Sequence, residues 1–109
     1  MKEIQSIDMF EKFIRQHRFS FLFISKEECG VCHALLPQVE EMLLKFPEIQ
    51  LGHIDAEAVE EIAGRLMIFT VPVLLLFVES KEYLREARFV HMHMLEEKIS
   101  RIYHGMITG

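Results

Sequence analysis

The chain contains two cysteines, and they stand close together in the sequence Cys29-Gly30-Val31-Cys32. The residues before them, 19–25, are rich in aromatic and branched side chains, which indicates a buried strand. From Val31 onward apolar residues recur at helical spacing, so Cys29 is expected at a helix N-terminus and Cys32 one turn inside the helix. Unpaired N–H groups and the helix dipole stabilise a thiolate there. Two thiols so placed can cycle between a dithiol and a disulfide.

Other chemistries use the same spacing. The five residues from Cys29 to His33 also match the attachment motif of c-type haem, and a cysteine pair can form half of a zinc site. Haem attachment needs an exported chain, and the strands expected here do not suit a small, mainly helical cytochrome. Zinc needs two further ligands, and with no second cysteine pair His53, His91 or His93 would have to supply them. A purely structural disulfide between such close residues constrains little of the unfolded chain. We therefore favour a redox-active pair, with neither metal nor cofactor.

Length and composition limit the function classes. The 109 residues are expected to form a single domain, 1–109, and a hydrophobic content of 50% is ample for a packed core. The net charge of −5 argues against nucleic acid and anionic membranes as partners. The first eight residues lack the apolar core of a secretory signal, so a cytoplasmic protein is expected. Because that compartment keeps thiols reduced, a close cysteine pair there favours catalysis over a structural role.

Hydrophobic periodicity predicts alternating helices and strands. After a first helix over 7–17, the order is strand, helix, strand, helix, two strands and a final helix. A parallel βαβ unit followed by an antiparallel hairpin is the expected arrangement. The predicted ranges are strand 19–25, helix 30–46 with Pro37 inside it, strand 49–54, helix 56–66, strand 71–78, turn 79–82, strand 83–90 and helix 95–103.

The element order, the cysteine pair and a proline about 40 residues later, in Thr70-Val71-Pro72, together resemble the thioredoxin family. The resemblance implies an α/β thioredoxin fold, with a central mixed four-stranded sheet flanked by helices and room for a short fifth strand at the N-terminus. It also implies that Cys29 attacks and Cys32 resolves. Pro72 would be a cis-proline facing the cysteines.

The same resemblance implies an activity and its partners. Such a protein is a thiol–disulfide oxidoreductase that reduces or exchanges disulfides of protein substrates, working as a monomer. Gly30, Val31, Val71 and Pro72 would contact the substrate, with Val71 offering its backbone. A reductase or a low-molecular-weight thiol would return electrons to the cysteines. The alternative is a thioredoxin-fold binding or redox-sensing module with little general reductase activity.

Several residues depart from the family pattern. Glu28 replaces the usual Trp before the first cysteine, and Phe23 stands where thioredoxins carry a buried Asp. The buried Lys that often partners this Asp falls near Leu51, and Arg88-Phe89 replaces a glycine expected late in the hairpin. Without the buried carboxylate, proton removal from the resolving cysteine must rely on water or on a nearby group.

Overall fold

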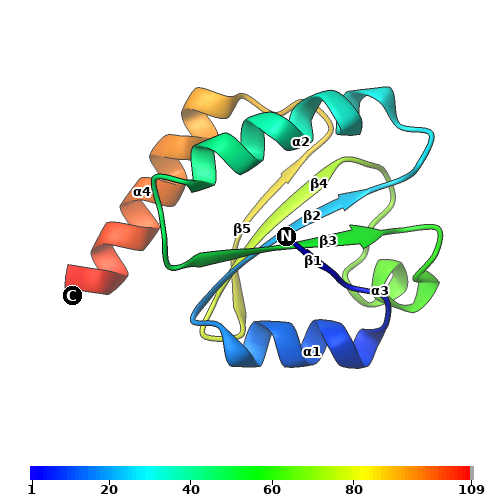
Figure 1. The fold of residues 1–109 in the computed structure, drawn as a ribbon, viewed down its shortest axis with the longest axis horizontal. Coiled ribbons are helices and arrows are strands. Elements are labelled where there is room, and N and C mark those ends of the chain that lie inside the picture. The colour runs from blue at the N-terminus through cyan, green and yellow to red at the C-terminus, as the bar shows by residue number, and fades with distance from the viewer. Residues whose placement is uncertain (109) are drawn as a thin grey trace.

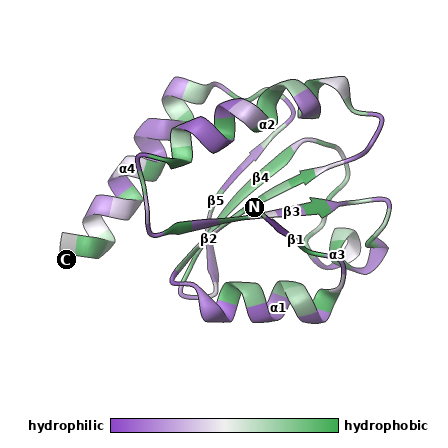
Figure 2. Cartoon of the chain, viewed as in Figure 1, coloured by the Kyte–Doolittle hydropathy of each residue, from purple (hydrophilic) through white to green (hydrophobic). Residues whose placement is uncertain are grey.

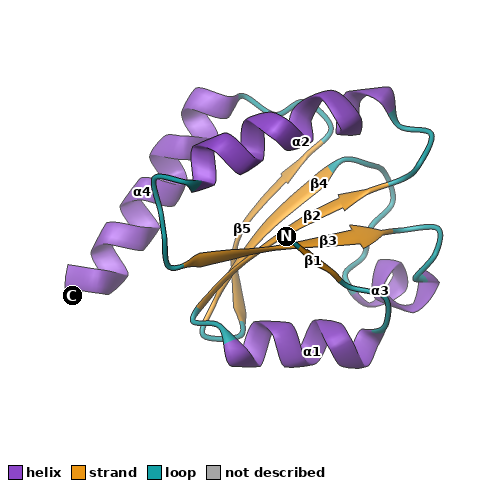
Figure 3. Cartoon of the chain, viewed as in Figure 1, coloured by secondary structure: helices purple, strands orange, loops and turns teal. Residues whose placement is uncertain are grey.

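A mixed sheet of five strands forms the centre of the molecule, and helices cover both of its faces (Figures 1 and 3). The computed structural model describes residues 1–108. The strands lie in the order β1-β3-β2-β4-β5, with β1, β3 and β2 parallel and with β4 and β5 antiparallel to their neighbours. The elements are β1 Lys2–Glu3, α1 Ile7–Gln16, β2 Phe19–Ser25, α2 Gly30–Leu43, β3 Ile49–Asp55, α3 Glu60–Arg65, β4 Val73–Val78, β5 Lys81–Ala87 and α4 Met92–Thr108.

The two central strands are buried along their whole length because helices pack on both sides of them. In β2, Phe19, Phe21 and Phe23 pack in one core cluster with α2 and α4, whereas Leu22 and Ile24 pack in a second cluster with α1 and α3. Successive side chains of a strand point to opposite faces, so a continuous apolar run is what a doubly covered strand requires. Figure 2 shows this hydrophobic character in the central strands and polar residues toward the edges.

The short N-terminal strand allowed for in the sequence is present. Lys2 and Glu3 pair in parallel with β3, in a register that places Glu3 opposite His53. The chain then enters α1 through Ser6, whose hydroxyl accepts a hydrogen bond from the Met9 N–H at 3.1 Å. This N-cap satisfies one of the free N–H groups at the helix start. The sheet therefore has five strands, and the fifth brings a carboxylate to its edge.

The hairpin turn is shorter than the sequence predicts, because Lys81 and Glu82, expected in the turn, pair with β4. Only Glu79 and Ser80 form the turn, with φ angles of 51° and 69°. Two consecutive left-handed residues give the twist that suits a tight hairpin. The Ser80 hydroxyl also donates to the carbonyl of Ile14 at 3.1 Å, so a contact with α1 holds the turn in place.

The third helix begins at Glu60, later than the predicted start at Ala56. The carboxylate of Asp55 accepts hydrogen bonds from the N–H groups of Glu57 at 2.9 Å and Ala58 at 3.2 Å. Such a side-chain turn competes with helix formation. The residues directly after β3 therefore stay outside the helix.

The last helix is longer than the predicted range 95–103, because residues beyond 103 also pack against the core. It runs over Met92–Thr108, and Met106 packs against the core cluster of α2. The guanidinium of Arg18 donates to the Met106 carbonyl at 2.8 Å.

Two other elements are shorter than predicted. Helix α2 ends at Leu43, and β4 begins only after Pro72, which has no N–H to donate.

Candidate functional site

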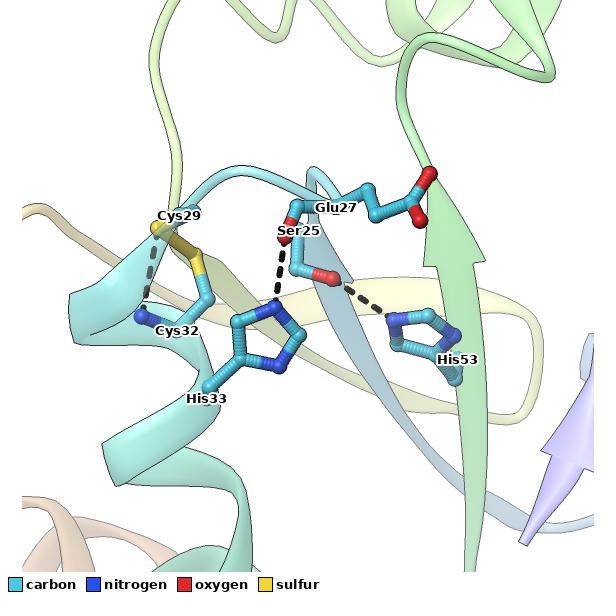
Figure 4. Close-up of a disulfide and its surroundings, with 6 residues drawn as sticks. All are labelled: Ser25, Glu27, Cys29, Cys32, His33 and His53. Atoms are coloured by element: carbon cyan, nitrogen blue, oxygen red, sulfur yellow. Dashed lines mark hydrogen bonds between the residues drawn. A yellow bond between two sulfur atoms is a disulfide. The ribbon is translucent and has the colours of Figure 1, made fainter.

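The two cysteines lie where the chain leaves β2 and enters α2, and they form a disulfide (Figure 4). Cys29 is the N-cap residue of α2 and Cys32 lies in its first turn, with their Cα atoms 5.2 Å apart. The predicted helix N-terminus and the predicted disulfide distance are both confirmed. The Sγ of Cys29 accepts a hydrogen bond from the Cys32 N–H at 3.1 Å. A reduced Cys29 in this place would have a free N–H of the helix as a partner for its thiolate.

The two sulfurs differ in their access to solvent. Cys29 is partly exposed, whereas Cys32 is 1% exposed and belongs to the core cluster beneath α2. Glu27 and Glu28, directly before Cys29, are both exposed. The Glu27 carboxylate points away from the sulfurs in Figure 4. Water can therefore screen the repulsion between these carboxylates and a Cys29 thiolate.

The other residues predicted to contact substrate lie in two segments. Gly30 and Val31 form the exposed start of α2, and the Val31 side chain is 62% exposed. Val71 and Pro72 lead into β4 and are joined by a cis peptide bond. Val71 and Cys29 both pack against the core cluster beneath α2. Within residues 1–108 no backbone hydrogen bond joins the Val71 main chain to another residue.

A hydrogen-bonded chain of three side chains lies beside the disulfide, and the sequence alone did not suggest it. The Ser25 hydroxyl is 2.6 Å from Nε2 of His53, and Nδ1 of the same ring is 2.7 Å from the Glu3 carboxylate. These residues come from the adjacent strands β2, β3 and β1. Only the pairing of the strands could have identified this group, because it places Glu3 and Phe23 on either side of His53.

A small pocket connects this chain to the buried sulfur. It has a volume of about 210 Å³ and is lined by Cys32, Ser25 and His53, with Phe23 and Leu36 on its apolar side. The His33 ring also lines the pocket, and its Nε2 is 2.6 Å from the carbonyl oxygen of Glu27. Phe23, at the position where the family pattern has a buried carboxylate, gives the pocket an apolar wall. Polar side chains line the rest of the same pocket.

No group of three or more potential metal ligands is found within the described residues 1–108. None of the helices in this part of the chain is long and apolar enough to cross a membrane.

Comparison with known proteins shows the family and the fold of this chain. The family model described as Thioredoxin matches residues 2–101. The chain belongs to the thioredoxin family. It is 55% identical over 103 residues to the thioredoxin-like protein YdfQ of Bacillus subtilis strain 168, covering 94% of this chain and 92% of that protein. It is also similar to a thioredoxin of Chlamydia pneumoniae, at 28% identity over 78% of this chain and 82% of the relative.

Solved thioredoxin structures share the fold. The thioredoxin of Fasciola hepatica superposes with a TM-score of 0.84 at 24% identity, covering 93% of this chain and 98% of that structure. The thioredoxin of Plasmodium falciparum gives the same TM-score at 19% identity, with the same coverage. The predicted thioredoxin fold is confirmed. The chain thus belongs to a family of thiol–disulfide oxidoreductases and keeps its pair of cysteines.

The departures from the thioredoxin pattern have clear structural settings. Phe23 is fully buried, so its ring fills the space of the missing carboxylate, and it stacks on His53 with ring centroids 6.3 Å apart. Glu28 is exposed at the surface beside Cys29. Arg88, in the segment Arg88-Phe89 that replaces the late glycine, has a φ of 65°, a left-handed conformation that is uncommon for arginine.

Proposed function

We propose that this protein reduces or exchanges disulfides of protein substrates, with Cys29 as the attacking residue and Cys32 as the resolving one. The observation that carries the proposal is the asymmetry of the pair. The partly exposed sulfur is at the helix N-terminus, and the other sulfur is buried one turn inside the helix. Attack on a large substrate requires the accessible, thiolate-stabilising position, whereas resolution requires only proximity to the first sulfur.

The reaction proceeds in two exchanges. The Cys29 thiolate attacks one sulfur of the substrate disulfide, and the other substrate sulfur leaves as a thiolate. Cys32 then loses its proton and attacks the sulfur of Cys29, which forms the Cys29–Cys32 disulfide and releases the second substrate thiolate. Two electrons pass from the protein to the substrate, whose thiolates take up protons from solvent. The structure with its disulfide corresponds to the oxidised protein.

Four further residues are proposed to bind the substrate. Gly30 and Val31 present an exposed surface next to the attacking sulfur. Val71 packs against the same core cluster as Cys29 and is joined to Pro72 by the cis bond, and within the described residues the main chain of Val71 has no backbone partner. An extended substrate segment can pair with such a free main chain in the manner of an added strand. Recognition through the backbone would accept many sequences around the substrate disulfide.

The proposed partners are protein disulfides on one side and an electron donor on the other. The donor is a reductase or a low-molecular-weight thiol, which returns two electrons to the Cys29–Cys32 disulfide. We further propose that the protein works as a monomer in the cytoplasm, where reducing conditions suit a protein that passes electrons to substrates.

Insulin reduction and substrate trapping test this function. The protein should accelerate insulin reduction by dithiothreitol, and Cys29→Ser should abolish the acceleration. Cys32→Ser should accumulate a mixed disulfide with insulin, because the attacking thiolate remains and the resolving thiol is lost. Cys29→Ser serves as the matched variant and should trap nothing.

Two results would contradict the proposal. Equal trapping by both serine variants would overturn the order of attack and resolution. Failure of the intact protein to accelerate insulin reduction, despite a reducible disulfide, would instead favour a binding or redox-sensing module.

A further inference from the structure

The resolving step needs a proton acceptor, and the residue expected to provide one is absent. Cys32 must become a thiolate before it can attack Cys29, yet its side chain is 1% exposed and lies in an apolar cluster. Burial in apolar surroundings disfavours a thiolate. Phe23 fills the position of the expected carboxylate and cannot accept a proton. Some other group near Cys32 has to take the proton.

The chain Glu3–His53–Ser25 has the geometry of a proton acceptor. A carboxylate only accepts hydrogen bonds, so the 2.7 Å contact with Glu3 fixes the proton of the His53 ring on Nδ1. Nε2 is then the basic nitrogen, and it accepts a hydrogen bond from the Ser25 hydroxyl at 2.6 Å. A carboxylate behind a histidine also stabilises the imidazolium that forms when the ring takes up a proton. The Ser25 residue is only 7% exposed, so it is placed to relay protons rather than to attack a substrate.

The pocket links the hydrogen-bonded side chains of Ser25 and His53 to the sulfur of Cys32. Cys32, Ser25 and His53 all line the same space of about 210 Å³. A space of this size with polar groups on its wall can hold water. A proton can therefore move from the Cys32 thiol to Nε2 of His53 through water and through the Ser25 hydroxyl.

The other charged or titratable groups that face the pocket are less suited to the task. The His33 ring donates through Nε2 to a neutral carbonyl, so its basic nitrogen Nδ1 lacks the support that the Glu3 carboxylate gives to the ring of His53. The Asp55 carboxylate accepts two backbone N–H groups. Lys26 is a cation, and Glu27 is exposed and directed away from the sulfurs (Figure 4).

We infer that His53, oriented by Glu3 and linked through Ser25, accepts the proton of Cys32 during resolution. The inference rests on the proposed function and adds a route for the proton to it. As Cys32 attacks, its S–H bond breaks, its electron pair forms the new bond to the sulfur of Cys29, and the proton passes to Nε2 of His53. The ring later returns the proton to solvent. Histidine suits this exchange because its charge ordinarily changes near neutral pH.

Stopped-flow reaction of the reduced protein with Ellman's reagent separates the two steps. Attack by Cys29 releases one thionitrobenzoate in a phase whose rate depends on reagent concentration. Attack by Cys32 releases a second one in a phase that does not. Release of both equivalents in this order tests the proposed function, and the rate of the second phase tests the inference. Failure of the one is therefore distinguishable from failure of the other.

His53→Gln keeps a polar side chain beside Ser25 but cannot take up the proton. We expect it to slow the second phase at pH 7 about tenfold or more and to leave the first phase unchanged. At pH 9 the difference should disappear, because solvent can then remove the proton. Glu3→Gln should also slow the second phase at pH 7, since the imidazolium that forms on His53 then lacks the carboxylate beside Nδ1. Ser25→Ala should slow the second phase in the same pH range.

Two histidine variants serve as matched controls. His33→Gln changes the other histidine of the pocket, and His17→Gln changes one that precedes β2, at the far end of that strand from the disulfide. Both should keep the wild-type second phase. A wild-type second phase in His53→Gln, or a loss of equal size at every pH, would overturn the inference. A slow second phase in His33→Gln alone would assign the proton to that residue and would also overturn it.

Discussion

At the scale of single residues, the protein gives its two sulfurs opposite environments. Cys29 has solvent on one side and the first turn of α2 on the other, with the Cys32 N–H at 3.1 Å from its Sγ. Cys32 is packed between the helix and the sheet and is 1% exposed. The difference arises because Cys29 is the N-cap and has an extended backbone outside the helix, whereas Cys32 lies inside the first turn and belongs to the core cluster beneath α2.

This asymmetry predicts selective alkylation of the reduced protein. Cys29 should react with iodoacetamide at least about tenfold faster than Cys32, because it is accessible and its thiolate is stabilised at the helix N-terminus. Quantitative peptide mapping after partial labelling measures the ratio. Labelling of the unfolded protein in denaturant is the control and should remove most of the preference. Faster labelling of Cys32 in the folded protein would refute the assignment of roles.

At the scale of elements, one arginine joins the edge hairpin to the end of α3. The Arg85 guanidinium donates to the Glu82 carboxylate at 2.9 Å and 3.0 Å and to the Leu66 carbonyl at 2.9 Å. Leu66 is the C-cap of α3, whose last carbonyls lack helical partners. The hydrogen bond from Arg85 lowers the pKa of the Glu82 carboxyl. The edge strand thereby helps to hold the segment that leads to Val71.

We expect Arg85→Gln to lower the free energy of unfolding by about 1 kcal/mol at neutral pH, the range for partly exposed ion pairs and single hydrogen bonds. The lowered pKa of Glu82 means that the ion pair stabilises the fold above the ordinary glutamate range. This contribution is lost as pH falls through the lowered value. Urea titrations at several pH values should show the deficit shrinking in acid. Arg101→Gln, at an exposed position of α4, is the control. A deficit that stays constant from neutral to acid pH would exclude the ion pair.

At the scale of the whole molecule, a glycine in the sheet leaves room for α1 and for the segment that leads to it. A Cβ on Gly52 of β3 would lie 2.7 Å from Cδ1 of Ile4 and 3.1 Å from side-chain atoms of both Leu22 and Phe13. These neighbours belong to β2, to α1 and to the segment between β1 and α1. The absence of a side chain lets α1 pack against the sheet and keeps β1, which carries Glu3, against β3.

Gly52→Ala should therefore lower the free energy of unfolding by about 1–3 kcal/mol through overpacking. Gly105→Ala is the control, because a Cβ there meets nothing within 4 Å and alanine favours a helix, so this variant should be neutral or stabilising. Ile4→Val removes the nearest atom. The double variant with Gly52→Ala should then lose less than the sum of the two single losses. Strict additivity of the two losses would show that the close contact is not the cause.

The sequence by itself determined the features that depend on near neighbours in the chain. The apolar run 19–25 and the helical spacing after Val31 place the cysteines between a strand and a helix, and both elements are as predicted at that junction. The spacing of Cys29 and Cys32 in the sequence limits the distance between their sulfurs once the helix forms. Hydrophobic periodicity and helix ends are local properties, so one sequence suffices to recognise them.

The tertiary structure decided those features of the site and the fold that depend on the pairing of distant segments. Glu3, Ser25 and His53 meet only because three parallel strands align in one register, which no local pattern specifies. The same holds for the hairpin turn at Glu79 and Ser80, which a contact with α1 anchors. Side chains on adjacent strands interact across the sheet whatever their separation along the chain. The cysteines could thus be found in the sequence, whereas the polar chain beside them required the fold.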